Sequence, residues 1–121
     1  MAVRENRLVT LVISPADYER ELALTGRGWV AEVDGELVGF AIGNAIRGNV
    51  WALFVDPEHE RSGHGRRLHD AMVAWLWSRG LERIWLTTDP GTRAERFYLA
   101  AGWRATGRVG NEVRYELERP K

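Results

Sequence analysis

The chain has 121 residues, 17 basic and 17 acidic residues, zero formal net charge and no cysteine. The length suits one domain, which we expect over residues 1–121, and 45% hydrophobic with 28% charged residues excludes a disordered or fibrous chain. Zero net charge argues against a nucleic-acid partner, whereas the absence of cysteine excludes disulfides and a cysteine nucleophile and suits a reducing cytoplasm.

The N-terminal third predicts strands and one short helix. Residues 7–13 form an apolar, β-branched run typical of a strand. Ser14 and Pro15 then resemble a helix N-cap and first position, and that helix is expected to end near Gly26. Strands over residues 29–33 and 37–45 flank Asp34-Gly35, a strong signal for a tight hairpin turn. No signal-peptide core precedes them, and the longest apolar run, residues 71–77, is too short to span a membrane.

The middle of the chain predicts a strand followed by a long helix. Residues 50–55 are apolar with almost no alternation, which predicts a central strand buried on both faces. The strand stops at Asp56-Pro57, because proline cannot donate to a sheet ladder. A helix over residues 65–79 follows with apolar residues on one face, and Gly80 is expected to end it.

The last third predicts a strand, a helix and a hairpin. Residues 83–88 form the strand, and Thr92 with Glu95 makes a capping box for a helix that ends at Gly102. Strands over residues 103–109 and 112–117 are joined through Gly110-Asn111. The sequence therefore predicts an α/β fold with a mixed, mostly antiparallel central sheet and helices packed on it.

The segment between the predicted central strand and the long helix carries the clearest chemical signal. Gly63 and Gly65 stand where the helix begins, so the backbone there can approach a ligand with its free amides. Such a helix start favours an anion, most naturally a phosphate. The loop lacks the lysine and spacing of a P-loop, and Leu68 stands where a dinucleotide fingerprint needs a third glycine.

Two motifs in this order resemble the GNAT superfamily of N-acetyltransferases. Leu53-Phe54-Val55-x-Pro57 followed by Gly63-x-Gly65 is similar to that family's acetyl-CoA loop. Ala94-x-x-Phe97-Tyr98-x-x-x-Gly102-Trp103 is similar to its later helix-to-strand signature. The resemblance runs from about residue 29 to residue 117. It implies the acyl-CoA N-acyltransferase fold and transfer of an acetyl group from acetyl-CoA to a primary amine, directly, because no cysteine can carry the group.

The resemblance also implies roles for particular residues. Backbone groups of Leu53, Phe54 and Val55 would pair with the pantetheine arm of acetyl-CoA. Tyr98 would protonate the departing thiolate. The pyrophosphate would be held by a run of backbone amides, those of Arg61, Ser62, Gly63, His64, Gly65 and Arg66. Two positions depart from the family pattern: Glu60 stands where Gln or Arg is usual, and Gly91 stands where Asn is frequent, so both put the strength of cofactor binding in question.

The route of the acceptor's proton stays open at this point. The strand over residues 49–55 carries no carboxylate, which leaves Glu32, His59, His64 or a water chain as candidates for a general base. An α-amine, with a pKa near 7.7–8.0, would need less help than a lysine-type amine near 10.4. We therefore expect a preference for α-amines.

Several side chains have two readings. His59, His64 and His69 recur every fifth residue, a spacing that fits no metal site, and we interpret them as loop and surface residues. Trp51 is either a core residue or a wall of the acceptor pocket. Arg66 and Arg67 either cover a solvated helix start or reach the adenosine 3′-phosphate.

The partner of the predicted enzyme is the least defined feature. The acceptor is expected to be a small-molecule amine or a peptide or protein, with a homodimer as one arrangement that would complete an open groove. No membrane or metal partner is expected. The alternative function is a CoA-binding regulatory or interaction module on the same fold with little turnover.

Overall fold

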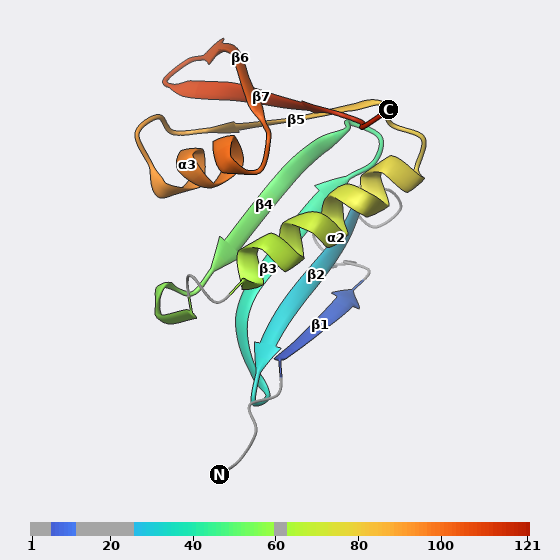
Figure 1. The fold of residues 1–121 in the computed structure, drawn as a ribbon, viewed down its shortest axis with the longest axis vertical. Helices are drawn as coiled ribbons and strands as arrows, with labels where there is room; N and C mark the ends of the chain where they lie inside the picture. Colours follow the sequence, from blue (N-terminus) through green and yellow to red (C-terminus); the bar gives the residue numbers. More distant parts are fainter. Residues whose placement is uncertain (1–5, 12–25, 60–62) are drawn as a thin grey trace, which may run out of the picture.

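The computed structural model describes residues 6–11, 26–59 and 63–121, which form a mixed seven-stranded sheet with order β1-β2-β3-β4-β5-β7-β6 (Figure 1). The predicted α/β fold is confirmed, whereas the helix predicted after Ser14 lies outside the described residues. The elements, in chain order, are β1 (Asn6–Leu11), β2 (Gly26–Val33), β3 (Glu36–Asn44), β4 (Asn49–Val55), the 3-10 turn η1 (Pro57–His59), α2 (His64–Ser78), β5 (Arg83–Thr88), α3 (Arg93–Ala100), β6 (Arg104–Val109) and β7 (Glu112–Glu118).

Strands β1 to β4 pair antiparallel in chain order, and short turns join β2 to β3 and β3 to β4. The predicted hairpin between β2 and β3 is confirmed, because Asp34 and Gly35 both adopt positive φ angles of 53° and 84°. The turn into β4 is fixed by Asn44, whose Oδ1 accepts hydrogen bonds from the amides of Ile46 and Arg47 at 3.0 and 2.8 Å. These four strands form the first wing of the sheet, and its last strand, β4, leads to the loop that contains Gly63.

Strands β4 and β5 are parallel neighbours that touch at one end and then diverge (Figure 1). Their register pair is Asn49 with Trp85, and the Trp85 amide donates to the Gly48 carbonyl at 3.0 Å. Strands β5, β7 and β6 continue as a second, antiparallel wing. The split leaves the C-terminal half of β4 without a register partner on its β5 side among the described residues.

The prediction that β4 is buried on both faces is wrong. Trp51 is 46% exposed and Phe54 is 50% exposed. The pairing with β3 skips from Ile42–Ala52 to Gly43–Val50, so Trp51 is the extra residue of a β-bulge, which re-aims its side chain. The apolar run therefore correctly predicted a central strand, but that strand is not covered on both faces.

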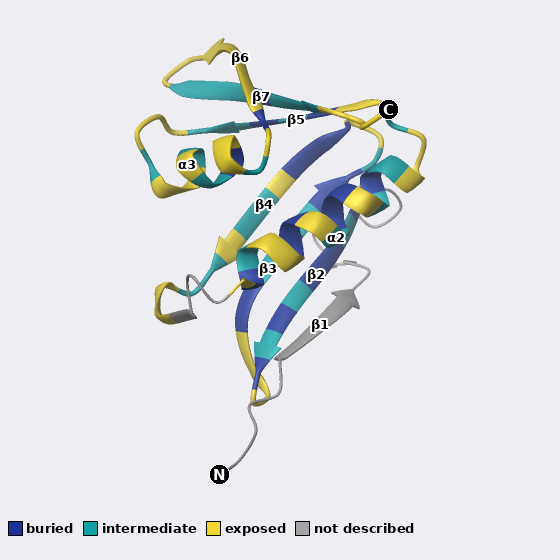
Figure 2. Ribbon diagram, viewed as in Figure 1, coloured by how far each residue is buried: buried dark blue, intermediate teal, exposed yellow. Residues whose placement is uncertain are grey.

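Helix α2 packs across β2, β3 and β4 with one buried face and one exposed face (Figure 2). Its inward residues Leu68, Met72 and Leu76 are fully buried. Gly43 on β3 leaves room for them, since a Cβ there would lie 3.1 Å from Met72 Cγ. The helix begins one residue earlier than predicted, and Gly80, with a φ of 91°, follows its end as expected.

Helix α3 begins at the predicted capping box. Thr92 Oγ1 accepts from the Glu95 amide at 3.2 Å, and Glu95 Oε1 accepts from the Gly91 amide at 3.0 Å. The Tyr115 hydroxyl on β7 donates to the other oxygen of Glu95, which fixes the start of α3 to the second wing. In the described part of the chain, neither helix is long and apolar enough to cross a membrane.

Candidate active site

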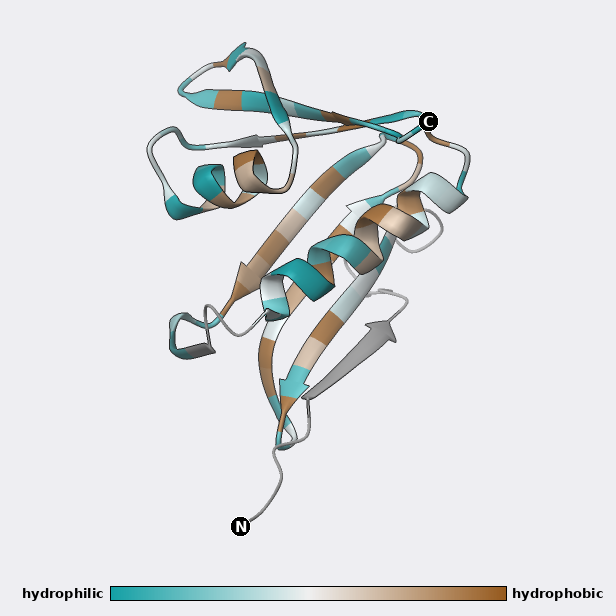
Figure 3. Ribbon diagram, in the orientation of Figure 1, coloured by the Kyte–Doolittle hydropathy of each residue, from teal (hydrophilic) through white to brown (hydrophobic). Residues whose placement is uncertain are grey.

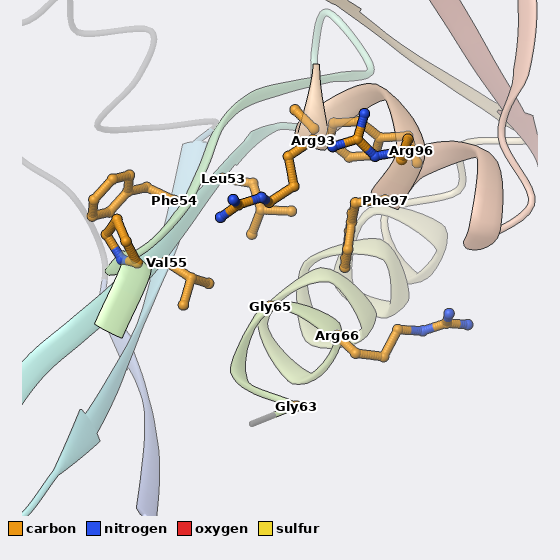
Figure 4. A pocket seen from close by; sticks show the side chains of 12 residues that line it. Leu53, Phe54, Val55, Gly63, Gly65, Arg66, Arg93, Arg96 and Phe97 are labelled. Atoms are coloured by element: carbon orange, nitrogen blue, oxygen red, sulfur yellow. The ribbon is translucent and has the colours of Figure 1, made fainter. Parts of the chain in front are cut away.

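A pocket of about 850 Å³ lies between the end of β4, the start of α2 and one side of α3 (Figure 4). That volume falls in the range of sites for cofactors and drug-sized ligands. Its walls come from three elements that are distant in sequence and meet because the sheet splits. The lining residues are Leu53, Phe54, Val55, Pro57, Gly63, Gly65, Arg66, Arg93, Ala94, Arg96, Phe97 and Tyr98.

The start of α2 brings backbone amides to the pocket. Gly63 is the N-cap with φ 82° and ψ 0°, a left-handed conformation that favours glycine, and no side chain caps the helix there. The first-turn amides consequently have no intrahelical acceptor and point outward with a partial positive charge. Gly63 and Gly65, two of the positions predicted to hold the pyrophosphate, line the pocket, whereas Arg61 and Ser62 lie outside the described residues.

Gly65 sets the width of the pocket floor. A Cβ at this position would lie 3.4 Å from Val55 Cγ2 on β4 and 3.5 Å from Phe97 Cε2 on α3. Those distances are ordinary van der Waals contact, so a methyl group would fill the gap between strand and helix without a clash. Glycine keeps that gap open for a ligand.

Three guanidinium groups border the pocket: Arg66 on α2, and Arg93 and Arg96 on α3 (Figure 4). The described lining residues contain no carboxylate and no imidazole, so the site is locally cationic in a chain of zero net charge. The start of α2 is also more hydrophilic than its later turns (Figure 3). Arg66 was predicted, whereas Arg93 and Arg96 were missed, although their spacing of three on a capped helix places them near each other.

Strand β4 presents alternating side chains at the pocket. Leu53 and Val55 point toward α2 and α3, and Phe54 points to the other side of the strand (Figure 4). Phe54 pairs with Phe40 on β3, with ring centroids 5.7 Å apart. The three predicted positions on β4 therefore all line the pocket, along the stretch where β4 has parted from β5.

Apart from the three arginines, Tyr98 is the described lining residue whose side chain can ionise. It is 6% exposed, and its ring packs edge-on against Phe97 and Trp103 at 5.4 and 5.5 Å. Burial raises the pKa of the Tyr98 hydroxyl well above its usual value. The hydroxyl thus keeps its proton throughout the neutral range and is available as a donor.

The interpretation of the histidines as surface residues is wrong for two of them. His64 is 4% exposed and His69 is 3% exposed, because both lie on the covered side of α2. Neither lines the pocket, and neither does Glu32, so two of the suggested general bases, Glu32 and His64, are not brought to it. The side chain of His59 lies outside the described residues.

The remaining predicted positions divide in the same way. Arg66 lines the pocket and Arg67 does not. Gly91 is exposed with a φ of 72° and donates its amide to Glu95, so it serves the cap of α3. Glu60 lies outside the described residues. Within the described ranges, no three acidic or histidine side chains gather as a metal site.

The site thus combines a split sheet, a helix start whose N-cap is Gly63, and a pocket lined by arginines and apolar side chains. Residues 5–103 match the model of the Acetyltransferase (GNAT) family. Since that match covers most of the chain, the protein belongs to this family, and the resemblance drawn from the two motifs is confirmed.

Particular relatives agree with this assignment. The chain is 39% identical over 85 residues to mycothiol acetyltransferase of Thermobispora bispora, covering 62% of this chain and 29% of that protein. The fold is similar to the PaiA N-acetyltransferase of Thermoplasma acidophilum, crystallised with coenzyme A, with a TM-score of 0.73, 18% identity and coverage of 78% and 62% of the two chains. It is also similar to an IAA acetyltransferase of Bacillus cereus, with a TM-score of 0.72, 14% identity and coverage of 95% and 100%. The chain spans less than two fifths of the length of the curated relatives it matches.

Proposed function

We propose that the protein transfers an acetyl group from acetyl-CoA to a primary amine within a ternary complex. The observation that carries this proposal is the position of Tyr98, a buried proton donor in the same pocket as the glycine-lined start of α2. A phosphate site alone would need the helix start, whereas a transferase also needs a proton donor at the reacting end. Both are present in one pocket.

The residues present fit the chemistry of acetyl-CoA. Its phosphates suit the amides near Gly63 and Gly65 and the guanidinium of Arg66, and Arg93 and Arg96 line the same pocket. Its apolar arm suits Val55 and Phe97, between which Gly65 keeps a gap. The β5-facing edge of β4 has lost its partner strand there, so backbone groups of residues 53–55 can pair with an extended ligand as an added strand would.

Tyr98 would act when the bond between the acetyl carbon and sulfur breaks. As the amine nitrogen bonds to that carbon and the carbon–sulfur bond breaks, negative charge develops on the leaving sulfur, and the Tyr98 hydroxyl gives it a proton. The nitrogen then loses its extra proton to solvent, and the Tyr98 phenolate takes a proton back from solvent, so that an amide and a thiol are the products. Burial raises the pKa of Tyr98, so its hydroxyl is protonated when the thiolate departs. General acid help of this kind contributes about 10²–10⁴ in rate.

The acceptor side favours an amine that is already neutral. The described pocket lining supplies no carboxylate or imidazole to take its proton. An α-amine, with a pKa of about 8, is deprotonated far more often at neutral pH than a lysine side chain at about 10.4. Trp51 and Phe54, half-exposed on β4, would offer apolar surface to the acceptor beside the reacting end.

A binding and turnover experiment tests the proposal. Calorimetric titration with acetyl-CoA, CoA and ATP should show binding of the first two, and thiol release over a panel of α-amines and ε-amines should show turnover. ATP binding without CoA binding would contradict the cofactor assignment. Binding of acetyl-CoA without thiol release for any amine would favour the alternative function, a CoA-binding interaction module.

A further inference from the structure

We infer that His69 is a positioning residue that holds Tyr98 in place relative to the start of α2, acting through Trp103. The inference rests on the function proposed for Tyr98. His69 lies on α2, which begins at the glycine loop, whereas Tyr98 and Trp103 lie at the end of α3 and just before β6. The two ends of the pocket are thereby joined by side chains as well as by the sheet.

Both ring nitrogens of His69 have partners. Trp103 Nε1 donates to His69 Nε2 at 2.9 Å, and His69 Nδ1 lies 2.8 Å from Asp70 Oδ1. Because an indole N–H can only donate, Nε2 must carry no proton, and the proton sits on Nδ1, where Asp70 accepts it. The neutral Nδ1-protonated tautomer is thus the form that satisfies both partners.

Trp103 contacts Tyr98 in two ways. Its backbone amide donates to the Tyr98 carbonyl at 3.0 Å. Its ring packs edge-on against the Tyr98 ring, with centroids 5.5 Å apart at 67°. His69 and Trp103 are each only 3% exposed, so the hydrogen bond between them is formed away from water. The indole that His69 holds therefore orients the ring of Tyr98, while the main-chain bond ties the end of α3 to the residue before β6.

The same connection runs outward to the cationic end of the pocket. Asp70 Oδ1, which accepts from His69, also accepts from Arg66 Nε at 3.1 Å. Arg66 lines the pocket beside the helix start. A continuous series of polar contacts thus leads from a pocket cation to the indole ring that packs on Tyr98.

The hydrogen bond between Trp103 and His69 sets a geometry that apolar packing alone would not set. The His69 ring also lies edge-on to Phe97 at 5.6 Å, inside a cluster of aromatic rings. Apolar rings in such a cluster can repack at little cost, whereas a hydrogen bond sets both distance and direction. The bond selects one arrangement of the cluster, and with it one position of the Tyr98 hydroxyl.

Protonation of His69 would break this arrangement. The groups facing it are Asp70 and Arg66 on α2 and Tyr98 on α3, beside the uncharged rings of Phe97 and Trp103. Burial lowers the pKa of His69 and the bond to Asp70 opposes that shift. The neutral form therefore persists at neutral pH. In acid, a proton on Nε2 would face the indole N–H and remove the bond.

Two substitutions separate positioning from mere packing. His69→Gln keeps an acceptor for Trp103 and a donor for Asp70 but does not titrate, whereas His69→Leu keeps bulk and loses the acceptor. Leu76→Val, two turns further along α2 against Gly43, is the matched control for loss of packing. With tyrosine ring carbons labelled and Tyr98 assigned through Tyr98→Phe, wild-type Tyr98 resonances should titrate in acid together with His69. They should shift in His69→Leu and lose the acid titration in His69→Gln.

Turnover gives a second, independent readout. We expect kcat to fall about tenfold or more in His69→Leu with KM for acetyl-CoA little changed, since small misplacements of reacting groups cost that much. His69→Gln should recover most of the loss, and Leu76→Val should retain wild-type kcat. Unchanged Tyr98 resonances in His69→Leu, or an equal fall of kcat in Leu76→Val, would overturn the inference. If wild type shows no thiol release, the proposed function fails, and the resonances alone decide whether His69 positions Tyr98.

Discussion

Asn49 and Trp85 form the register pair at which β4 and β5 part, with no second pair between the two strands in the described residues. The Trp85 indole also donates to the Arg47 carbonyl at 2.9 Å, which anchors β5 to the turn that starts β4. Because the strands are joined at this end and separate beyond it, the far half of β4 borders a pocket instead of a neighbouring strand. The site is therefore a product of the sheet's topology.

Tyr98→Phe tests the proton donor most simply. The ring and its aromatic contacts remain, so the fold and acetyl-CoA affinity should be unchanged, while kcat should fall by about 10²-fold or more. Since burial raises the Tyr98 pKa, its hydroxyl stays protonated to at least about pH 10, and wild-type rates should not decline through its ionisation below that pH. Steady-state thiol release, measured at about five pH values between roughly pH 6 and pH 10, gives kcat for both proteins and its dependence on pH. Equal kcat in the two proteins would refute the role.

Gly65→Ala should change stability and binding in opposite directions. Alanine is favoured over glycine within a helix by about 0.5–1 kcal/mol, and the added methyl meets Val55 and Phe97 at contact distance, so Tm should not fall. The same methyl closes the pocket floor, and acetyl-CoA affinity should drop by about tenfold, or ~1.4 kcal/mol. Gly107→Ala on β6, where a methyl meets nothing within 4 Å, is the control. Undiminished binding in Gly65→Ala would show that the ligand does not pass this position.

The arginines on α3 should supply salt-dependent affinity. Arg96→Gln and Arg93→Gln each remove a guanidinium from the pocket wall, so acetyl-CoA should bind several-fold more weakly, about 1 kcal/mol each, and the difference should shrink as salt is added. Arg79→Gln, at the far end of α2, should leave binding unchanged. Titration calorimetry at two salt concentrations makes the comparison. The same affinity loss in all three variants would mean that net charge matters and the pocket position does not.

The bond between Tyr115 and Glu95 should stabilise the fold in a pH-dependent way. The Tyr115 and Gly91 hydrogen bonds lower the pKa of Glu95, and a carboxyl with a depressed folded pKa stabilises above its unfolded pKa of about 4.3. That stability is lost as pH falls through the lower folded pKa. Glu95→Gln should therefore lower Tm at pH 7 by a few degrees, roughly 3–5 °C, with the gap to wild type narrowing below about pH 4. A difference in Tm between wild type and Glu95→Gln that stays constant down to about pH 3 would contradict this.

Local signals predicted much of the framework. Asp34-Gly35 and the pair Thr92 and Glu95 were readable because turns and caps depend on residues a few positions apart. Gly63 and Gly65 were readable for the same reason, since a helix start and its anion preference are local properties. These features predicted the element order and located the helix start to which we assign the phosphates in the proposed function.

The partners that come from distant segments were not readable. His69 contacts Trp103, which lies 34 positions later in the sequence. The regular spacing of the histidines suggested a surface residue, because it carries no information about this distant partner in the core. The exposure of Phe54 likewise depends on which face of the sheet the helices cover, which no pattern within β4 records. Arg93 and Arg96 lay next to a recognised cap, and a helical-face argument from that cap would have brought them to the pocket.

Thiol release from acetyl-CoA by the wild-type chain, followed with a panel of primary amines and with the acetylated product identified by mass, tests the central claim most directly. The account predicts release that requires the amine, greater rates for α-amines than for ε-amines below pH 8, roughly the α-amine pKa, and loss of release in Tyr98→Phe. Acetyl-CoA binding with no amine-dependent release, or equal release from both amine classes and from Tyr98→Phe, would contradict it.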